Sequence, residues 1–304
     1  MIKIISIEGA TGSGKSSLAL KLAKELNTEI ISADSRQVYK FLNIGTAKPE
    51  AHILSEIKHH LIDIITPEKK YSAGLFVKET EKIIKRLNSE GKIPIICGGS
   101  MLYIKSLLEG ISEIPEIPSN IIIQTKQFME THNLSECYEL VKTIDSKFSS
   151  SISPSDKQRI SRALEVWFAF SKPITAYWET QEQKNIYNPF KICIDRNRNE
   201  LYETINNRMI AMINQGLLEE IKSVLDMGYK KEDYGLNSVG YKEFVDIIIS
   251  KNFSKMRECI DMAAQHTRNY AKRQITWYRK ENFDSILFDE DTNITTLIEK
   301  ILKK

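Results

Sequence analysis

Cysteine is scarce in this sequence: four cysteines lie far apart among 304 residues and form no Cys-x-x-Cys pair. This spacing gives no support to a zinc site or a disulfide framework and favours reduced thiols. The five histidines are scattered as well, and only His59 and His60 are adjacent. Neighbours on a strand point to opposite faces, so we interpret these histidines as structural.

The chain also lacks a long apolar run and a strong net charge. No stretch approaches the roughly 20 apolar residues that a membrane helix needs. The first residues, MIKIISIEGATGSGKS, read directly into a strand and a loop, which leaves no room for a signal or transit peptide. We therefore expect a cytoplasmic monomer with no membrane segment. The net charge is only +3, so local basic clusters must carry any argument for a nucleic-acid partner.

What the first third of the chain does have is an alternation of strand and helix patterns. Short apolar segments at 2–8, 29–35 and 92–100 have strand character, and apolar residues recur at helical spacing in 16–27 and 73–90. This alternation is typical of a parallel sheet in an α/β protein. The stretch between the second strand and about residue 67 is predicted to be irregular.

The pattern changes at a proline-rich segment after about residue 110. Residues 113–187 are predicted to be helical, a strand at 190–196 returns to the sheet, and the remainder is predicted to be helical. The fold class is therefore α/β, with a P-loop NTPase-like parallel-sheet core and a helical C-terminal part. We assign residues 1–112 and 188–304 to this core and 113–187 to a helical insertion domain.

One insertion helix has clear start and stop signals. Ser153 is the predicted N-cap, Pro154 fits the first turn, Asp156 would complete a capping box, and Pro173 would end the helix. Apolar residues at helical spacing are predicted to face a core. These are Ile160, Leu164 and Trp167.

Residues 9–16, GATGSGKS, match the phosphate-binding pattern G-x-x-x-x-G-K-S/T between a predicted strand and a predicted helix. The glycines let backbone N–H groups converge on a phosphate, Lys15 adds a positive charge, and Ser16 can bind Mg²⁺. Such a loop usually holds a nucleoside triphosphate. The pattern predicts polyphosphate binding without specifying which polyphosphate, and a glycine-rich turn without a ligand is the alternative.

Two further segments end predicted strands at the edge where an α/β sheet binds its ligand. In SADSRQVY, residues 32–39, Asp34 could act as a base for an acceptor or bind Mg²⁺ through water. The alternative role of Asp34 is to cap a helix or turn. In the segment 98–100, Gly98 and Gly99 allow close backbone approach, and Ser100 could touch a ligand.

A basic segment lies near the C-terminus, where five basic residues and no acid occur between Arg268 and Lys280. On a helix one face could meet a polyanion while the other packs, although a solvated face would look the same. Two more arginines lie on the insertion helix, which suggests a long anionic ligand that touches both parts. On the C-terminal helix, one face would carry Arg268, Lys272 and Arg279, and the opposite face would carry Tyr270 and Trp277. The two arginines of the insertion helix are Arg159 and Arg162.

Nine segments together resemble the tRNA dimethylallyltransferase family, also called tRNA isopentenyltransferase, of the bacterial type. In order they are GATGSGKS, SADSRQVY, NIGTAKP, HHLIDI, YSAGLF, GGSMLYI, QRISRALEV, SVGYKEF and TRNYAKRQITWYR. The resemblance runs from about residue 4 to about residue 280. It implies transfer of a dimethylallyl group from dimethylallyl diphosphate to N6 of adenosine 37, in tRNAs that read codons beginning with U. It also implies release of diphosphate, a requirement for Mg²⁺ and binding of the tRNA anticodon stem-loop.

The resemblance assigns roles to individual residues. Asp34 would take the proton from N6, with Lys15 and Ser16 as further catalytic residues and Ser16 as the metal ligand. The implied diphosphate contacts are Gly9, Ala10, Thr11, Gly12, Ser13, Gly14, Lys15, Ser16 and Arg198. The implied or suggested tRNA contacts are Asp34, Ser35, Arg36, Gln37, Ser100, Gln158, Arg159, Ile160, Ser161, Arg162, Arg268, Lys272 and Arg273.

The chain departs from the family pattern at a few positions. Ala10 stands where proline is usual, and Ser16 and Ser100 stand where threonine is usual. Thr204 occupies a position that is commonly arginine, which leaves Arg198 as the expected diphosphate contact from that segment. Two alternative functions share the phosphate-binding loop: a small-molecule kinase, and prenylation of free adenine nucleotides.

Overall fold

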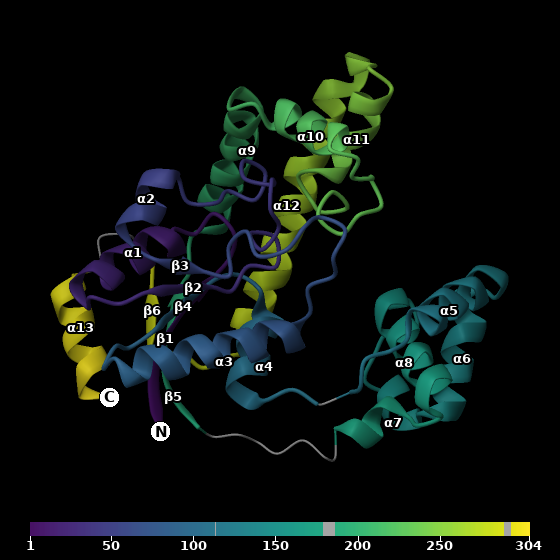
Figure 1. Ribbon diagram of the computed structural model, residues 1–304, viewed down its shortest axis with the longest axis horizontal. Coiled ribbons are helices and arrows are strands. Elements are labelled where there is room, and N and C mark those ends of the chain that lie inside the picture. Colours follow the sequence, from purple (N-terminus) through teal and green to yellow (C-terminus); the bar gives the residue numbers. More distant parts are fainter. Residues whose placement is uncertain (113, 179–185, 289–292) are drawn as a thin grey trace. The chain divides into compact units, whose positions relative to one another are not determined.

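The computed structural model describes residues 1–112, 114–178, 186–288 and 293–304. The chain forms two compact units (Figure 1). The first, here called the core unit, comprises Met1–Leu108 and Asn185–Lys304; the second, here called the helical unit, comprises Glu109–Lys184. No helix in the described part of the chain is long and apolar enough to cross a membrane.

A six-stranded parallel sheet lies inside the core unit, with the strand order β3-β2-β4-β1-β5-β6. The longest pairing joins β1 to β5 over eight residues, whereas β1 pairs with β4 over three. The all-parallel sheet confirms the predicted α/β class. The strands are β1 (Ile2–Gly9), β2 (Ile30–Ser32), β3 (His59–His60), β4 (Ile95–Cys97), β5 (Tyr187–Ile194) and β6 (Ser285–Leu287).

Alternate residues of the central strands feed two hydrophobic clusters on opposite faces of the sheet, as the period of a strand requires. Ile4 and Ile96 belong to one cluster, and Ile5 and Ile95 belong to the other. Both faces are therefore buried, which explains the nearly continuous apolar strands. Helices α3 (Ala73–Ser89) and α4 (Met101–Glu109) pack in the first cluster, and α1 (Lys15–Glu25) and α13 (Ile294–Lys303) pack in the second.

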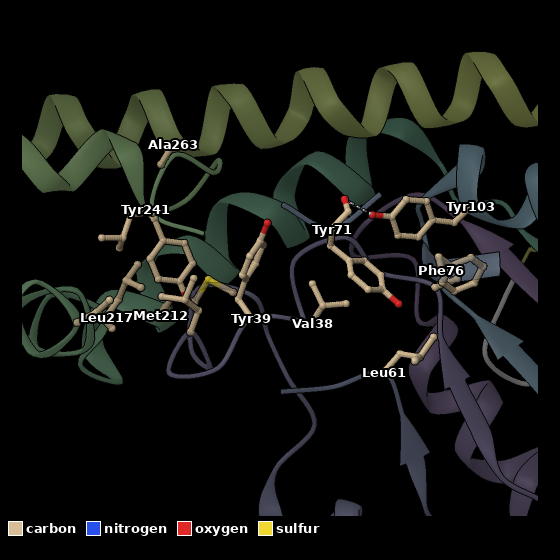
Figure 2. Packing of buried hydrophobic residues seen from close by; sticks show 14 of the residues in the cluster. Val38, Tyr39, Leu61, Tyr71, Phe76, Tyr103, Met212, Leu217, Tyr241 and Ala263 are labelled. Carbon is tan, nitrogen blue, oxygen red and sulfur yellow. Dashed lines mark hydrogen bonds between the residues drawn. The ribbon is translucent and has the colours of Figure 1, made fainter. Parts of the chain in front are cut away.

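The first cluster continues beneath the C-terminal helices. Figure 2 shows Met212, Leu217 and Tyr241 gathered at one end of it, while Phe76 and Tyr103 stack at the other with ring centroids 4.8 Å apart. One apolar body therefore joins the sheet to the helices that follow β5. Those helices are α9 (Arg198–Asn214), α10 (Leu217–Asp226), α11 (Lys242–Ile249) and α12 (Met256–Tyr278). The short helix α2 (Ala51–Glu56) lies earlier in the chain, between β2 and β3.

Two short strands were not predicted. The pair His59–His60 forms β3 beside β2 within the stretch predicted to be irregular, and Ser285–Leu287 forms β6 beside β5 within the part predicted to be helical. Each lies at an edge of the sheet. Strands of two or three residues are too short to show an alternating pattern, so their pairing is decided by the neighbouring strand.

The helical unit has a small core of its own, and its described residues contain no strand. Ile160 and Leu164 are fully buried in that core as predicted, but Trp167 is only half-buried and Val166 fills the neighbouring core position. The described elements are α5 (Ser119–Thr131), α6 (Leu134–Ile144), α7 (Ser146–Ser149), α8 (Lys157–Phe170) and the 3-10 helix η1 (Ile174–Tyr177).

The N-cap of α8 differs from the predicted one. The helix begins at Lys157, and Asp156 caps it by accepting a hydrogen bond from the Arg159 N–H at 3.1 Å. The Ser153 hydroxyl instead accepts from the N–H of Ser155 at 3.3 Å, within the turn before the helix. Asp and Ser are both good caps, and two such residues three positions apart make the first turn ambiguous in sequence.

Candidate active site

The phosphate-binding loop connects β1 to α1 as the sequence predicts. Gly14 is the N-cap of α1 with φ 95°, a conformation that favours glycine, and a Cβ at Gly9 would lie 2.6 Å from the Ile194 carbonyl oxygen. The N–H groups of Gly12, Gly14 and Ser16 have no hydrogen-bond partner among the described residues. Unpaired N–H groups at a helix N-terminus are the feature that binds phosphate.

Lys15 points back into this loop, where its Nζ donates to the Ala10 carbonyl at 2.6 Å. Burial lowers the pKa of Lys15, Asp34 counteracts that shift, and the Arg208 guanidinium adds to it. The charges of Asp34 and Arg208 therefore both act on Lys15. An anion on the loop would compensate these two half-buried cations.

Asp34 lies two residues beyond β2 and is half-buried. Its Oδ1 accepts from the N–H of Arg36 at 2.7 Å and more weakly from that of Gln37 at 3.4 Å, so Asp34 does cap a turn. The turn is also held by the segment that follows β4, because the Ser100 hydroxyl accepts from the Ser35 N–H at 3.0 Å. Capping occupies Oδ1, and Oδ2 makes no hydrogen bond among the residues that the structure describes.

Asp34 shares one pocket of about 260 Å³ with residues that lie far from it in the sequence. Burial lowers the pKa of Arg208 on α9, and the Asp34 carboxylate counteracts that shift. Burial raises the pKa of Tyr270 on α12 to about 12, so its hydroxyl stays protonated. The pocket therefore combines a carboxylate, cations and apolar walls. Its lining includes Thr11, Asp34, Arg208, Met212, Tyr270 and Arg273.

Gln274 joins α12 to the phosphate-binding loop. Its Oε1 accepts from the Thr11 N–H at 2.9 Å, and its Nε2 donates to the Gly99 carbonyl at 2.8 Å. The side chain is only 1% exposed. Thr11 was predicted to contact diphosphate, but its N–H is already taken by this glutamine.

The other predicted residues of the core unit are spread around the site. Arg36 and Arg273 line the Asp34 pocket, and Arg36 also donates to the Tyr234 carbonyl at 3.2 Å. The Gln37 side chain is held by hydrogen bonds with Ser32 and Ala47. A separate pocket of about 780 Å³ is lined by Arg198, Lys272 and Arg279, and Arg268 pairs with Asn206.

Five predicted tRNA contacts lie on α8 of the helical unit. Gln158 and Arg159 are exposed, and Arg159 pairs with Asp156 at 2.7 Å. Arg162 and Ser161 both contact Glu165, at 3.2 and 3.4 Å. Ile160 differs from these four because its side chain is fully buried in the core of the unit. Two arginines are thus presented from one helix.

The part of the chain that the structure describes contains no group of three His, Cys, Asp or Glu residues that could hold a metal. Ser16 is exposed at the first turn of α1, the position predicted for the metal ligand. Mg²⁺ typically keeps several waters and binds through substrate phosphates with one or two protein oxygens. The residues present therefore fit Mg²⁺ that arrives with a diphosphate and do not form a closed metal cage.

Sequence reasoning missed three residues that the fold brings to the site, namely Arg208, Tyr270 and Gln274. Arg208 and Arg198 both fit the arginine spacing of the family pattern in the segment after β5, but only Arg198 was predicted to contact diphosphate. Tyr270 was assigned to a packing face, whereas it lines the pocket. Gln274 lies in the basic segment, where the prediction rested on the cationic side chains and so did not include a neutral one.

Comparison with known proteins gives one consistent result. The family described as IPP transferase matches residues 37–281 of the chain. Proteins named tRNA dimethylallyltransferase are similar over nearly the whole length. That of a Thermoanaerobacter species is 38% identical, covering 99% of this chain and 97% of the relative. That of Aquifex aeolicus is 39% identical, covering 95% and 93%.

Solved structures agree. The tRNA isopentenylpyrophosphate transferase of Staphylococcus epidermidis is 33% identical with a TM-score of 0.69, covering 100% of this chain and 98% of that one. A eukaryotic dimethylallyltransferase described as acting on tRNA is 25% identical with a TM-score of 0.80, covering 98% of this chain and 78% of that one. With a family match over most of its length and relatives near 40% identity, the chain belongs to the IPP transferase family.

Proposed function

We propose that this protein transfers a dimethylallyl group from dimethylallyl diphosphate to N6 of adenosine 37 in tRNAs that read codons beginning with U, and releases diphosphate. The observation that carries the proposal is that Asp34 and Arg208 line the same pocket as Thr11 of the phosphate-binding loop. An acceptor base and a diphosphate donor would meet there. The names of the relatives, tRNA dimethylallyltransferase, support the same reaction.

The loop would hold the diphosphate as a leaving group. The unpaired N–H groups of the loop, together with Lys15 and Arg208, would stabilise the negative charge that grows on the diphosphate as the allylic C–O bond breaks. Lys15 would exchange its bond to the Ala10 carbonyl for one to the ligand. A kinase loop makes the same interactions with its phosphates. In a kinase a P–O bond breaks, whereas in the proposed reaction the C–O bond on the other side of that oxygen breaks.

Asp34 would serve the acceptor. An exocyclic adenine amine is a poor nucleophile and loses a proton as it attacks, so a carboxylate at the pocket can accept that proton. Oδ1 is occupied by the turn, which leaves Oδ2 for the base. N6 is out of reach inside a stacked anticodon loop, so the adenosine must be flipped into the pocket. Met212 and Tyr270 provide apolar walls for a flat ring.

Basic residues of both units would bind the anticodon stem-loop. Arg36 and Arg273 line the pocket into which the adenosine would enter. Arg159 and Arg162 are presented by α8. We propose the cytoplasm as the compartment and a monomer as the acting species.

Mg²⁺ would be bound by the Ser16 hydroxyl and by the donor, and it would neutralise charge on the departing diphosphate. Ser16 is suited to this because it is exposed at the N-terminus of α1. The role of the chain itself would be to align the diphosphate with the pocket that contains Asp34.

The test is incubation of the purified protein with labelled dimethylallyl diphosphate, Mg²⁺ and an unmodified tRNA. Label should appear in the RNA at the adenosine 3′ of the anticodon. Equal labelling of free AMP would favour prenylation of nucleotides instead. Transfer of label from γ-labelled ATP to a small acceptor, without prenyl transfer, would contradict the proposal in favour of a kinase.

A further inference from the structure

Gln274 is a buried polar side chain between α12 and the phosphate-binding loop, and it uses both ends of its amide. It accepts from Thr11 N–H at 2.9 Å and donates to the Gly99 carbonyl at 2.8 Å. Tyr270, one turn earlier on α12, also donates to the Gly99 carbonyl, at 3.4 Å. Two residues of one helix face therefore converge on the backbone that follows β4.

The fit around Gln274 is tight. A Cβ placed on Gly99 would lie 2.2 Å from Gln274 Nε2, so residue 99 must be glycine for the amide to reach the backbone. The glutamine is 1% exposed, and water cannot replace its two bonds. Its orientation is fixed by chemistry, because only the amide oxygen can accept from an N–H and only the amide nitrogen can donate to a carbonyl.

The contacts of Gln274 lead to both halves of the site. Through Thr11 it touches the loop that would hold the diphosphate. Through Gly99 it touches the residue before Ser100, whose hydroxyl accepts from Ser35 N–H next to Asp34. The path from loop to catalytic turn thus runs through one amide group.

We propose that Gln274 is a positioning residue that sets the phosphate-binding loop against the Asp34 turn, so that a bound diphosphate faces the acceptor. This inference rests on the proposed function and deepens it. It also assigns the Thr11 N–H to the framework, which leaves the N–H groups of Gly12, Gly14 and Ser16 to bind the anion.

The first test is the variant Gln274→Met, which keeps the length of the side chain and removes both hydrogen bonds. Binding of inorganic pyrophosphate, measured by calorimetry with Mg²⁺ and without RNA, should weaken about ten-fold, as expected for a loop that loses a fixing hydrogen bond. kcat should fall as well, whereas affinity for unmodified tRNA should not change. A residue with only a structural role would lower all three together with the melting temperature.

Gln265 offers a matched control, because it is a glutamine on the same helix but exposed. Gln265→Met should leave pyrophosphate affinity and kcat at the wild-type values. The proposal is overturned if folded Gln274→Met binds pyrophosphate as the wild-type protein does, or if its tRNA affinity falls in parallel.

Amide hydrogen exchange in the wild-type protein tests the same contact without any variant. The Thr11 amide should exchange slowly before pyrophosphate is added and change little afterwards, whereas the amides of Gly12, Gly14 and Ser16 should become protected only with the anion. Fast exchange at Thr11 would overturn the positioning contact. If the wild-type protein does not bind pyrophosphate, the proposed function is contradicted instead. Exchange at the Thr11 amide, measured without the anion, would still show whether the positioning contact exists.

Discussion

The ring of Tyr241 lies directly against the backbone of Gly45, so closely that a Cβ at residue 45 would fall 2.5 Å from two ring carbons. The Tyr241 hydroxyl donates to Glu220 at 2.7 Å, and the same carboxylate accepts from Asn43 N–H at 2.8 Å and Ile44 N–H at 2.9 Å. Burial and the nearby Glu220 charge raise the pKa of Tyr241 well above its usual value. These contacts fix the segment 43–47, which contributes Gly45 and Thr46 to the pocket wall.

Gly45→Ala should therefore destabilise the protein, because the rigid buried ring of Tyr241 cannot move away from a new methyl group. We expect a loss of about 1–3 kcal/mol in the free energy of unfolding, the usual cost of overpacking. Urea denaturation of the variant measures it. Gly74→Ala is the matched control, since its Cβ would meet nothing closer than Ser72 Oγ at 3.8 Å. An unchanged midpoint for Gly45→Ala would contradict the contact.

Replacing Asp34 by Asn separates its two roles. Asn retains a side-chain oxygen that can cap the turn through the N–H of Arg36, but it cannot take a proton. Turnover should fall by roughly 10²–10⁴-fold with little change in stability or tRNA affinity. Single-turnover prenylation and a thermal melt measure the two effects. Wild-type turnover in Asp34→Asn would assign this residue to capping alone.

The two arginines of α9 can be compared directly. Arg208 lines the pocket that contains Asp34, whereas Arg198 lines another pocket and donates to the Tyr202 hydroxyl at 3.0 Å. Arg208→Gln should weaken pyrophosphate binding by about 10- to 100-fold, as loss of a charged hydrogen bond does. Arg198→Gln should have the smaller effect in the same calorimetric titration. The reverse order would return the diphosphate contact to Arg198, as first predicted.

Glu29, next to β2, should make stability depend on pH in the acid range. Burial alone would raise the pKa of Glu29, but hydrogen bonds from Arg86 and His60 outweigh it and lower the value to about 2. A depressed carboxyl pKa stabilises the fold above the unfolded value of 4.5, and this contribution is lost as pH falls toward about 2. The stability difference between wild type and Glu29→Gln should therefore shrink across that window.

Urea titrations at several pH values measure this difference. Glu25→Gln is the control, because Glu25 is exposed on α1, and its effect should stay flat over the same range. A difference for Glu29→Gln that is constant between pH 4.5 and pH 2 would exclude the pairing with Arg86 and His60.

The helical unit should contribute phosphate contacts through Arg159. Arg159→Gln should weaken tRNA binding and reduce the salt slope of log K by at most about one unit, the contribution of one neutralised phosphate. Filter binding across a range of salt concentrations measures the slope. Lys142 on α6, exposed and paired with Glu139 at 3.1 Å, supplies the control Lys142→Gln. An equal slope in the wild type and Arg159→Gln would make Arg159 an ordinary surface residue.

The parts of the site that could be predicted are those encoded by local pattern. The loop at 9–16 follows from spacing alone, and Asp34 follows from its place at the end of a strand. Gln274 could not be found in this way, because its partner Thr11 lies 263 residues earlier in the chain and both bonds go to backbone atoms. Arg208 is similar, since its relation to Asp34 depends on how α9 packs.

The fold shows the same division. The apolar strands and the helix 73–89 were predicted to within a few residues, because their periodicity is strong. The edge strands β3 and β6 were missed, since two or three residues adopt strand geometry only when a neighbour pairs with them. The helix cap at Asp156 was missed because the competing Ser153 is equally suitable in sequence.

The place of β5 in the sheet also bears on how the chain folds as it is synthesised. β1 leaves the ribosome first, but its eight-residue partner β5 is made only after the whole helical unit. Residues 109–184 have a core of their own, so this unit can become compact while β1 still lacks one neighbour. The edge of β1 that pairs with β5 therefore stays open from the synthesis of Gly9 until that of Tyr187, and an unpaired strand edge can pair with other chains during that interval.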